Sequence, residues 1–205
     1  MGRYTGPVCR LCRREGTQLY LKGHRCYKSS CNLDSPPGMH NWRKGKLSEF
    51  GKRLREKQKV KRYYGIYEKQ FKNYFNQATR QQGNTGENLL VLLERRLDNV
   101  VCRGQFTHTR ASARQLITHG HLLINGKKVD IPSYLVKVGD VIEVKKKESS
   151  KNIVVRNIEN PTPAAVPSWL EVDKETPSIK VAQLPNRDEI QIEIQDQMIV
   201  EFCSR

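Results

Sequence analysis

Four of the six cysteines of this 205-residue chain lie within its first 31 residues, and they constrain the N-terminal region more than any other feature. They form two pairs, Cys9-x-x-Cys12 and Cys26-x4-Cys31, separated by thirteen residues. Short pairs of this kind present two thiolates to one tetrahedral ion. The spacing therefore predicts one Zn²⁺ ion held by Cys9, Cys12, Cys26 and Cys31. Because protein ligands fill all four positions, such a site is structural rather than catalytic.

The alternatives are disulfides, unligated thiols, a vestigial site or one formed by a single cysteine pair, and a site in which His24 replaces one sulfur. The N-terminus, MGRYTGPVCR, lacks the apolar core of a secretory signal, and no window holds the roughly 18 apolar residues of a membrane span. We therefore expect an intracellular protein without a membrane partner, in a compartment where paired cysteines more often hold a metal than each other. Nearby cations would offset the thiolate charge and lower the thiol pKa values: Arg10, Arg13, Arg14, Lys22, Arg25 and Lys28.

The formal net charge is +16 and the pI is about 9.8, although 37% of the residues are hydrophobic. This imbalance indicates an anionic partner, with nucleic acid favoured over an acidic membrane surface or an acidic protein. Lys and Arg are dense in residues 1–80, whereas residues 171–201 are mixed or acidic. We expect the binding face to lie mostly in the N-terminal half.

A basic loop and a basic helix follow the cysteines. The segment DSPPGMHNWRKGK has Pro and Gly residues that forbid long regular structure, and it places Lys44 and Lys46 in a loop. The next segment predicts a helix whose apolar stripe includes Leu47, Phe50 and Leu54. Cations cover most of its remaining surface: Lys52, Arg53, Arg55, Lys57, Lys59, Lys61 and Arg62. Glu49 and Glu56 cannot balance them, so we expect phosphates to neutralise this helix; a merely solvated face is the alternative.

Two further helical patterns indicate core. Residues 67–78 place Tyr67, Phe71, Tyr74, Phe75 and Ala78 at helical spacing, which favours packing over a base-stacking platform. After a Gly-Asn-Thr-Gly break, ENLLVLLERRLDNVV predicts a single core helix lined by Leu89, Leu93, Leu97 and Val101.

Residues 109–144 predict a small module of one helix and a sheet. Thr109 is a favourable N-cap for a helix over 110–118, and Asn125-Gly126 is the turn of a hairpin, followed by two short strands around Gly139-Asp140. One face of this module would carry Arg110, Arg114, His119, Lys127 and Lys128. A rigid basic face of this kind fits the phosphates of a folded RNA. Beyond Ser149 the chain becomes Pro-rich, and residues 189–194 and 198–202 read as strands.

Several long segments, taken in order, resemble the bacterial small-subunit ribosomal protein S-four family: MGRYTGP, the four cysteines, LSEFGKRLREKQKVKRYYGI, RLDNVV, RASARQLITHGHLLINGKKVDIPSYLV and IVEFCSR. The likeness spans the whole chain. The piece HGHLLINGKKV alone is similar to the αL RNA-binding module of certain pseudouridine synthases, a heat-shock ribosome binder and tyrosyl-tRNA synthetases.

The resemblance implies an α+β fold with four parts. These are a zinc-binding N-terminal region and basic loop (1–46), a helical rRNA-binding domain (47–95), a second domain (96–195) containing the αL module (about 96–160), and a C-terminal tail (196–205) that returns to the first domain. It adds Arg3, Arg13 and Arg14 to the RNA-facing residues. Gly104-Gln105 and Met39-His40-Asn41 depart from the family pattern, in loops that carry no expected ligand.

The resemblance also implies a function. We expect a structural constituent of the small ribosomal subunit, a monomer within the subunit in the cytoplasm of a bacterium or in a plastid. It would be a primary binder of 16S rRNA at the five-way junction of the 5′ domain, where it nucleates assembly of the subunit body. It would lie beside ribosomal protein S-five and near the path by which mRNA enters, and it would influence translational accuracy.

Two other functions compete with this one. An RNA-modifying enzyme would carry the αL module beside a catalytic domain, but the remaining segment is short and shows no catalytic constellation, so we expect no enzymatic activity. Cys102 lies in an apolar helical stripe, which favours a core position. A free-standing RNA binder would use only the αL module and would leave the zinc pairs and the basic helix without a role.

Overall fold

The computed structural model describes residues 4–28, 31, 33–40, 45–190 and 192–204. The chain divides into two compact units, residues 1–90 with 191–205, and residues 91–190. In this division the N-terminal region, the basic helix and the C-terminal segment belong to one unit. Arg3 and Lys44, two of the expected RNA-facing residues, lie outside the described residues.

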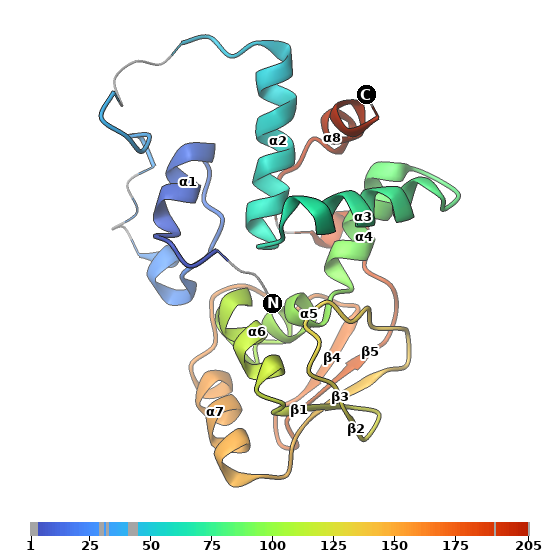
Figure 1. The fold of residues 1–205 in the computed structure, drawn as a ribbon. Coiled ribbons are helices and arrows are strands. Elements are labelled where there is room, and N and C mark those ends of the chain that lie inside the picture. Colours follow the sequence, from blue (N-terminus) through green and yellow to red (C-terminus); the bar gives the residue numbers. More distant parts are fainter. Residues whose placement is uncertain (1–3, 29–30, 32, 41–44, 191, 205) are drawn as a thin grey trace. The chain divides into compact units, whose positions relative to one another are not determined.

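The first unit is helical (Figure 1). Its elements are α1 (Cys9–Glu15), a 3₁₀ helix η1 (Gly23–Tyr27), α2 (Glu49–Tyr63), α3 (Glu68–Thr79), the start of α4 (Thr85–Glu94) and α8 (Asp196–Cys203). The hydroxyl of Ser48 accepts a hydrogen bond from the Gly51 amide at 3.2 Å and thereby caps α2. The C-terminal helix α8 packs against α2, although it is far away in sequence.

The buried side of α2 differs from the expected stripe. Leu47 and Phe50 are 54% and 58% exposed, whereas Lys57, Val60 and Tyr63 are buried. The expected stripe was wrong because α2 begins only at Glu49, after Leu47, and its apolar contacts concentrate in its last two turns. Phe50 instead lies beside Phe202 of α8, with ring centroids 5.3 Å apart.

The aromatic stripe of α3 is confirmed as core over most of its length. Phe71, Tyr74, Phe75 and Ala78 are buried, but Tyr67 is 50% exposed because it precedes the helix as its N-cap residue.

The single helix expected over 87–101 is two helices, α4 and α5 (Leu97–Arg103), although all four expected core residues are buried. The break lies at Arg96, whose backbone is extended and pairs with Leu135 in an isolated β-bridge. The Leu97 amide donates to the Tyr134 carbonyl at 2.8 Å. Pairing with a distant segment therefore overrides the local helical pattern.

The second unit contains a five-stranded antiparallel sheet in the order β2-β1-β3-β5-β4 (Figure 1). The strands are β1 (Leu122–Ile124), β2 (Lys127–Lys128), β3 (Val141–Val144), β4 (Leu170–Asp173) and β5 (Ser178–Val181). The hairpin turn is confirmed, since Asn125 and Gly126 both have positive φ, at 50° and 76°. Only one of the two strands expected around Gly139-Asp140 forms, namely β3.

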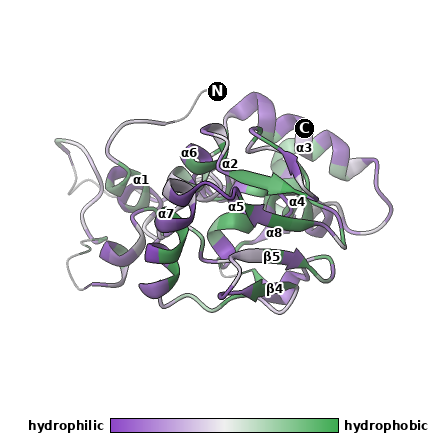
Figure 2. Ribbon diagram, turned by 90° about the horizontal axis from the view of Figure 1, so that it is seen from below, coloured by the Kyte–Doolittle hydropathy of each residue, from purple (hydrophilic) through white to green (hydrophobic). Residues whose placement is uncertain are grey.

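Helices α6 (Arg110–Thr118) and α7 (Glu148–Glu159) complete this unit with α5. As expected, Thr109 caps α6 by accepting from the Ser112 amide at 3.1 Å. Trp169, Phe106 and Ile117 are fully buried in the core between the helices and the sheet. Sequence reasoning missed α7, which carries both hydrophobic and hydrophilic residues (Figure 2) and buries Val154. The fold class is α+β, as expected.

The prediction of strands over residues 189–194 and 198–202 was wrong. Residues 198–202 lie in α8, because Ile199 and Phe202, three positions apart, face the rest of the first unit and α2. Residues 187–189 form a 3₁₀ helix, η2 (Arg187–Glu189), and no strand is assigned over the described part of 189–194. Ile190, Ile192 and Ile194 are nevertheless buried at alternate positions, which explains why the segment resembles a strand.

Candidate nucleic-acid interface

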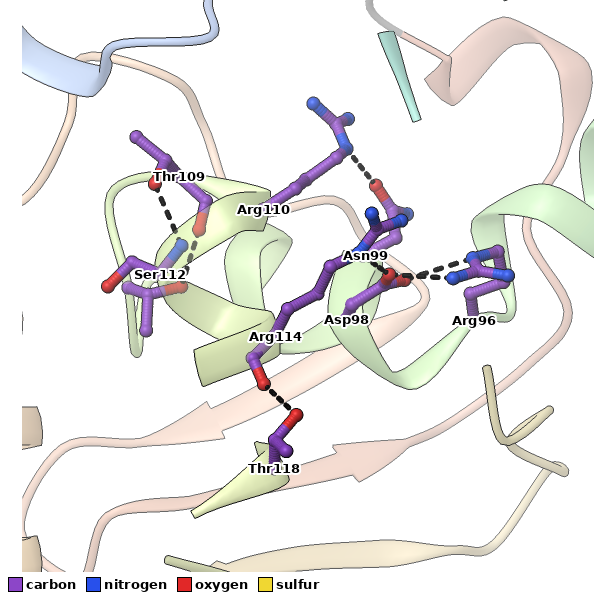
Figure 3. A network of polar contacts seen from close by, with 9 residues as sticks. Arg96, Asp98, Asn99, Thr109, Arg110, Ser112, Arg114 and Thr118 are labelled. Atoms are coloured by element: carbon purple, nitrogen blue, oxygen red, sulfur yellow. Dashed lines mark hydrogen bonds and ion pairs between the residues drawn. The ribbon is translucent and has the colours of Figure 1, made fainter. Parts of the chain in front are cut away.

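Two arginines of α6 are held by α5. Arg110 and Arg114 are four residues apart and so share one side of α6. The Nε of Arg114 donates to Oδ2 of Asp98 at 2.7 Å, and the Nε of Arg110 donates to Oδ1 of Asn99 at 2.8 Å (Figure 3). The structure thus brings together two predicted site residues and two residues that sequence reasoning missed.

Asp98 and Asn99 belong to a buried polar network. Asp98 also accepts two hydrogen bonds from Arg96, Nε to Oδ1 at 3.1 Å and Nη2 to Oδ2 at 2.7 Å. Asn99 donates from Nδ2 to the carbonyl of Glu94 at 3.0 Å and to its Oε2 at 2.7 Å. Asp98 and Asn99 could have been recognised from the sequence as two polar residues inside the apolar run of α5. Polar groups buried in this way require hydrogen-bond partners.

The hairpin brings Lys128 to the C-terminal end of α6. A Cβ on Gly120 would lie 2.6 Å from Cε of Lys128, so the lysine stem crosses the backbone at this glycine. His119, Lys127 and Lys128 are exposed. The Nδ1 of His121 lies 2.9 Å from Oγ of Ser150, and burial, together with nearby His119 and lysines, lowers the pKa of His121. The structure therefore places Lys128 next to His119, on the module that carries Arg110 and Arg114.

The cations of α2 meet carboxylates from distant parts of the first unit. Arg53 pairs with Glu201 of α8 at 2.8 Å, Arg55 and Arg62 pair with Glu15 of α1, and Lys57 and Lys61 pair with Glu68 of α3. Lys52 and Lys59 pair with Glu49 and Glu56 within the helix. The count of charges along this helix was incomplete, because Glu15, Glu68 and Glu201 belong to other elements, and phosphate binding by α2 stays a prediction.

Glu15 connects the cysteine region to α2. Its side chain is 1% exposed and lies against the guanidinium groups of Arg55 and Arg62. Burial raises the pKa of Glu15, and the two arginines partly oppose that rise. On the same helix α1, Arg13 donates to the carbonyls of Ser35 and Pro36, at 2.5 and 3.2 Å, and so ties the following loop to α1. Arg14 and Lys46 are exposed.

The four N-terminal cysteines line one pocket of about 300 Å³ together with Arg13, Lys22 and Arg25. Within the part of the chain that the structure describes, no group of three or more His, Cys, Asp or Glu side chains lies close enough together to hold a metal ion. The backbone amide of Lys22 donates to Sγ of Cys26 at 3.2 Å, and the Leu19 backbone makes a hydrogen bond to Cys12. Amide donors directed at sulfur favour thiolates, so this donor set fits a soft dication.

The expected lowering of the thiol pKa values by cations is outweighed at Cys26, where Lys22 does act to lower the pKa, and no cation effect is resolved at Cys12. Burial raises the pKa of Cys12 and of Cys26, and the other cysteines of the pocket raise them further. All four thiols line the same pocket. Without a dication at its centre, this pocket therefore disfavours several thiolates at once.

The chain matches known proteins along its whole length. Residues 3–94 match the family described as Ribosomal protein S4/S9 N-terminal domain, and residues 95–142 match the S4 domain. Small ribosomal subunit protein uS4 of Thermodesulfovibrio yellowstonii is 52% identical over 208 residues, and that of Acetivibrio thermocellus is 54% identical over 208 residues, with 100% of each chain covered. The uS4 protein of Thermoanaerobacter sp. is 53% identical over the same length.

The chain belongs to the small ribosomal subunit protein uS4 family.

This family consists of structural proteins and not of enzymes, which agrees with the expectation of no catalysis. Cys102, for which a core position was expected, is half-buried against the core of the S4 domain, and burial raises its pKa. At a raised pKa the cysteine stays in its less reactive, protonated thiol form.

In the described part of the chain, no helix is long and apolar enough to cross a membrane.

Gly104 and Gln105, one of the two expected departures from the family pattern, lie close to β5. A Cβ on Gly104 would lie 2.4 Å from Cδ1 of Ile179, so any larger residue would require the Ile179 side chain to shift. Gln105 follows with a positive φ of 62°, and its Nε2 donates to the Ala164 carbonyl at 2.7 Å. At the other departure, Met39 is 79% exposed, and Asn41 lies outside the described residues.

Lys57 has a position that suits packing better than an RNA contact. It is 6% exposed, pairs with Glu68, and its Nζ lies 4.8 Å from the centroid of the Phe202 ring. Burial works to raise the pKa of Glu68, but hydrogen bonds from Lys57 and Lys61 outweigh it and hold that pKa below its ordinary value. The Glu68 pairing therefore stabilises the fold fully above the unfolded-state pKa of about 4.3 and is lost as pH falls through the lower folded-state pKa.

We expect Lys57→Met to loosen α8 while leaving RNA affinity within about twofold, because the cation–π contact is worth about 0.5–2 kcal/mol and the ammonium is not at the surface. Hydrogen exchange of residues 196–203 measures the first effect and an RNA titration the second. Lys61→Met is the matched control, since Lys61 also pairs with Glu68, at 3.0 Å, without the Phe202 contact. A large loss of RNA affinity in Lys57→Met alone would return Lys57 to the interface.

Proposed function

We propose that this chain is a structural constituent of the small ribosomal subunit in the bacterial cytoplasm, where it binds rRNA. The observation that carries the proposal is the identity of 52–54% with uS4 proteins over the full length of both chains. The net charge of +16 agrees with a polyanionic partner.

Within this role we propose two RNA-binding surfaces. The first consists of Arg14, Lys46 and the outer cations of α2, which are all of its cations except the buried Lys57: Lys52, Arg53, Arg55, Lys59, Lys61 and Arg62. The second consists of Arg110, Arg114, His119, Lys127 and Lys128 on the S4 domain. Supporting the second surface are the arginines held in place by α5 and the lysine held over Gly120. Surfaces ordered before binding lower the entropic cost of association.

We further propose that Cys9, Cys12, Cys26 and Cys31 hold one structural Zn²⁺ ion. Support comes from the shared pocket of the four cysteines and from the amide donors directed at Cys12 and Cys26. When bound, the ion would fix α1 against η1. Since Glu15 at the end of α1 contacts Arg55 and Arg62, that rigidity would extend to α2.

The finer role is also a proposal. We infer binding at the five-way junction of the 5′ domain of 16S rRNA, early enough to nucleate assembly of the subunit body. We also infer a position beside ribosomal protein S-five and the path of incoming mRNA, with an influence on accuracy. These inferences rest on the family resemblance of the whole chain.

Titration of the zinc-loaded protein against a 5′-domain fragment of 16S rRNA tests the central proposal. The control is an unrelated folded RNA of equal length, and both titrations are repeated at several salt concentrations. We expect binding to the rRNA fragment to be at least about a thousandfold tighter near physiological salt, the lower end of typical specific recognition of nucleic acids. Equal affinities that fall together as salt rises would reduce the binding to non-specific charge attraction.

A further inference from the structure

The carboxylate of Asp98 occupies the centre of the polar network in the S4 domain. Its side chain is 1% exposed, and it lies between Arg96 and Arg114 (Figure 3). Arg96 takes both carboxylate oxygens and is itself 1% exposed. The buried carboxylate of Asp98 thus pairs both with Arg96, which is itself buried, and with Arg114, one of the candidate RNA-binding arginines of α6.

The amide of Asn99 is equally constrained. Its NH₂ group donates twice to Glu94, so its oxygen has to face Arg110. Because an amide carries no charge, Asn99 orients the guanidinium of Arg110 without neutralising it. Arg103 forms a salt bridge with the same Glu94 carboxylate, with its Nε 3.7 Å from Oε2.

The network joins four arginines, Arg96, Arg103, Arg110 and Arg114, to Glu94, Asp98 and Asn99. Arg110 and Arg114 are the two of these arginines that lie on α6. Guanidinium groups form charge-assisted hydrogen bonds with phosphate, so two arginines held on one side of a helix suit an anionic ligand.

The geometry of the two contacts suits positioning. Both use Nε, one of the five guanidinium donors and the one nearest the chain. An Nε bond to a fixed acceptor sets the plane of the guanidinium group, and guanidinium groups bind phosphate oxygens most strongly through paired, planar donors. Asp98 and Asn99 are adjacent on α5 and Arg110 and Arg114 are one turn apart on α6, so the two helices align both planes together.

We propose that Asp98 and Asn99 are positioning residues that fix the guanidinium groups of Arg114 and Arg110 for binding RNA phosphates. This rests on the proposed RNA-binding role of α6. The effect on affinity runs through the arginines, since both positioning side chains are buried.

A double-mutant cycle on the full-length, zinc-loaded protein tests the proposal, with affinity for the 5′-domain rRNA fragment as the readout. Positioning predicts that Asp98→Asn weakens binding about threefold to tenfold at an unchanged salt slope, because Arg114 still neutralises its phosphate but has to be ordered on binding. Charge alone predicts the reverse, tighter binding, since a carboxylate is removed. Glu171→Gln is the matched control, as it removes one carboxylate from an exposed pair with Lys180 on the sheet.

The second arm of the cycle separates positioning from stability. In the Arg114→Ala background, Asp98→Asn should cause no further loss of affinity. Equal loss in both backgrounds would mean that Asp98 acts through folding alone and would overturn the proposal. Unchanged affinity in Arg114→Ala itself would overturn the RNA-binding role of this arginine, whereas loss in Arg114→Ala with none in Asp98→Asn would overturn positioning only.

A second variant covers the case in which Asp98→Asn fails to fold, since Arg96 would lose its buried partner. Asn99→Ala leaves the net charge unchanged and removes the acceptor of Arg110. We expect an affinity weaker by about threefold to tenfold at an unchanged salt slope, with no further loss in the Arg110→Ala background. An Asn99→Ala variant that folds and binds with unaltered affinity would overturn the proposal.

Discussion

Replacing Cys9 by Ser is expected to remove most of the bound zinc and to loosen the N-terminal region while the S4 domain stays folded. A structural zinc site is worth about 10–16 kcal/mol in metal binding near neutral pH, and that free energy depends on the complete ligand set. Zinc per chain after gel filtration measures the first effect. Hydrogen exchange measures the second, with faster exchange expected in residues 9–27 and unchanged protection in residues 110–144.

The control for this experiment is Cys203→Ser. Cys203 is half-buried at the end of α8 and belongs to neither cysteine pair. We expect this variant to retain one zinc per chain. A Cys9→Ser protein that still carries one zinc would contradict the four-thiolate set and would favour a site completed by another ligand such as His24. A wild-type protein without zinc would contradict the metal site itself.

Loss of zinc should also weaken rRNA binding, although every cation remains. Cys9 and Cys12 of the pocket lie on α1, so a bound ion would anchor this helix, and Glu15 at its end contacts Arg55 and Arg62 of α2. If α1 loosens, these arginines lose a fixed partner and have to be ordered on binding. Charge alone would predict unchanged or stronger binding, so the direction of the change distinguishes preorganisation from attraction.

Local patterns in the sequence predicted those parts of the fold that local chemistry decides. The N-cap at Thr109, the helix over 110–118 and the Asn125-Gly126 turn depend on neighbouring residues alone, and all three are confirmed. The core of α3 follows from one helical period. The helix break at Arg96 was not predictable in this way, because its extended backbone is paired with Leu135.

The same limit explains the C-terminus and the candidate site. Residues 198–202 have apolar residues that suit a strand or a helix, and packing of Phe202 against α2 decides for the helix. The spacing of Arg110 and Arg114 identified them as surface cations, but their partners are on another helix. Likewise, Glu15, Glu68 and Glu201 neutralise α2 from three other elements, so a count of charges along that helix overstated its excess.

The remaining excess on α2 leads to the second large prediction, in which two of its outer cations are neutralised. Lys52→Gln with Arg53→Gln is expected to weaken rRNA binding roughly ten- to a hundredfold and to lower the salt slope by about two, since two charge-assisted phosphate contacts are lost. Both residues are accessible, with side chains 46% and 24% exposed. Isothermal titration or filter binding over a range of salt concentrations measures both quantities.

The matched control breaks the same two ion pairs by replacing the carboxylate partners instead of the cations. Glu49→Gln with Glu201→Gln removes the partners of Lys52 and Arg53, which lie at 2.7 and 2.8 Å, but changes the charge in the opposite direction. Because exposed pairs contribute only about 0–1 kcal/mol to stability, neither double variant should unfold. If α2 binds phosphates, the carboxylate variant binds rRNA as tightly as wild type or more tightly. Equal weakening in both variants would mean that the pairs act by holding α8 on α2, and no change in either would place the interface elsewhere on the protein.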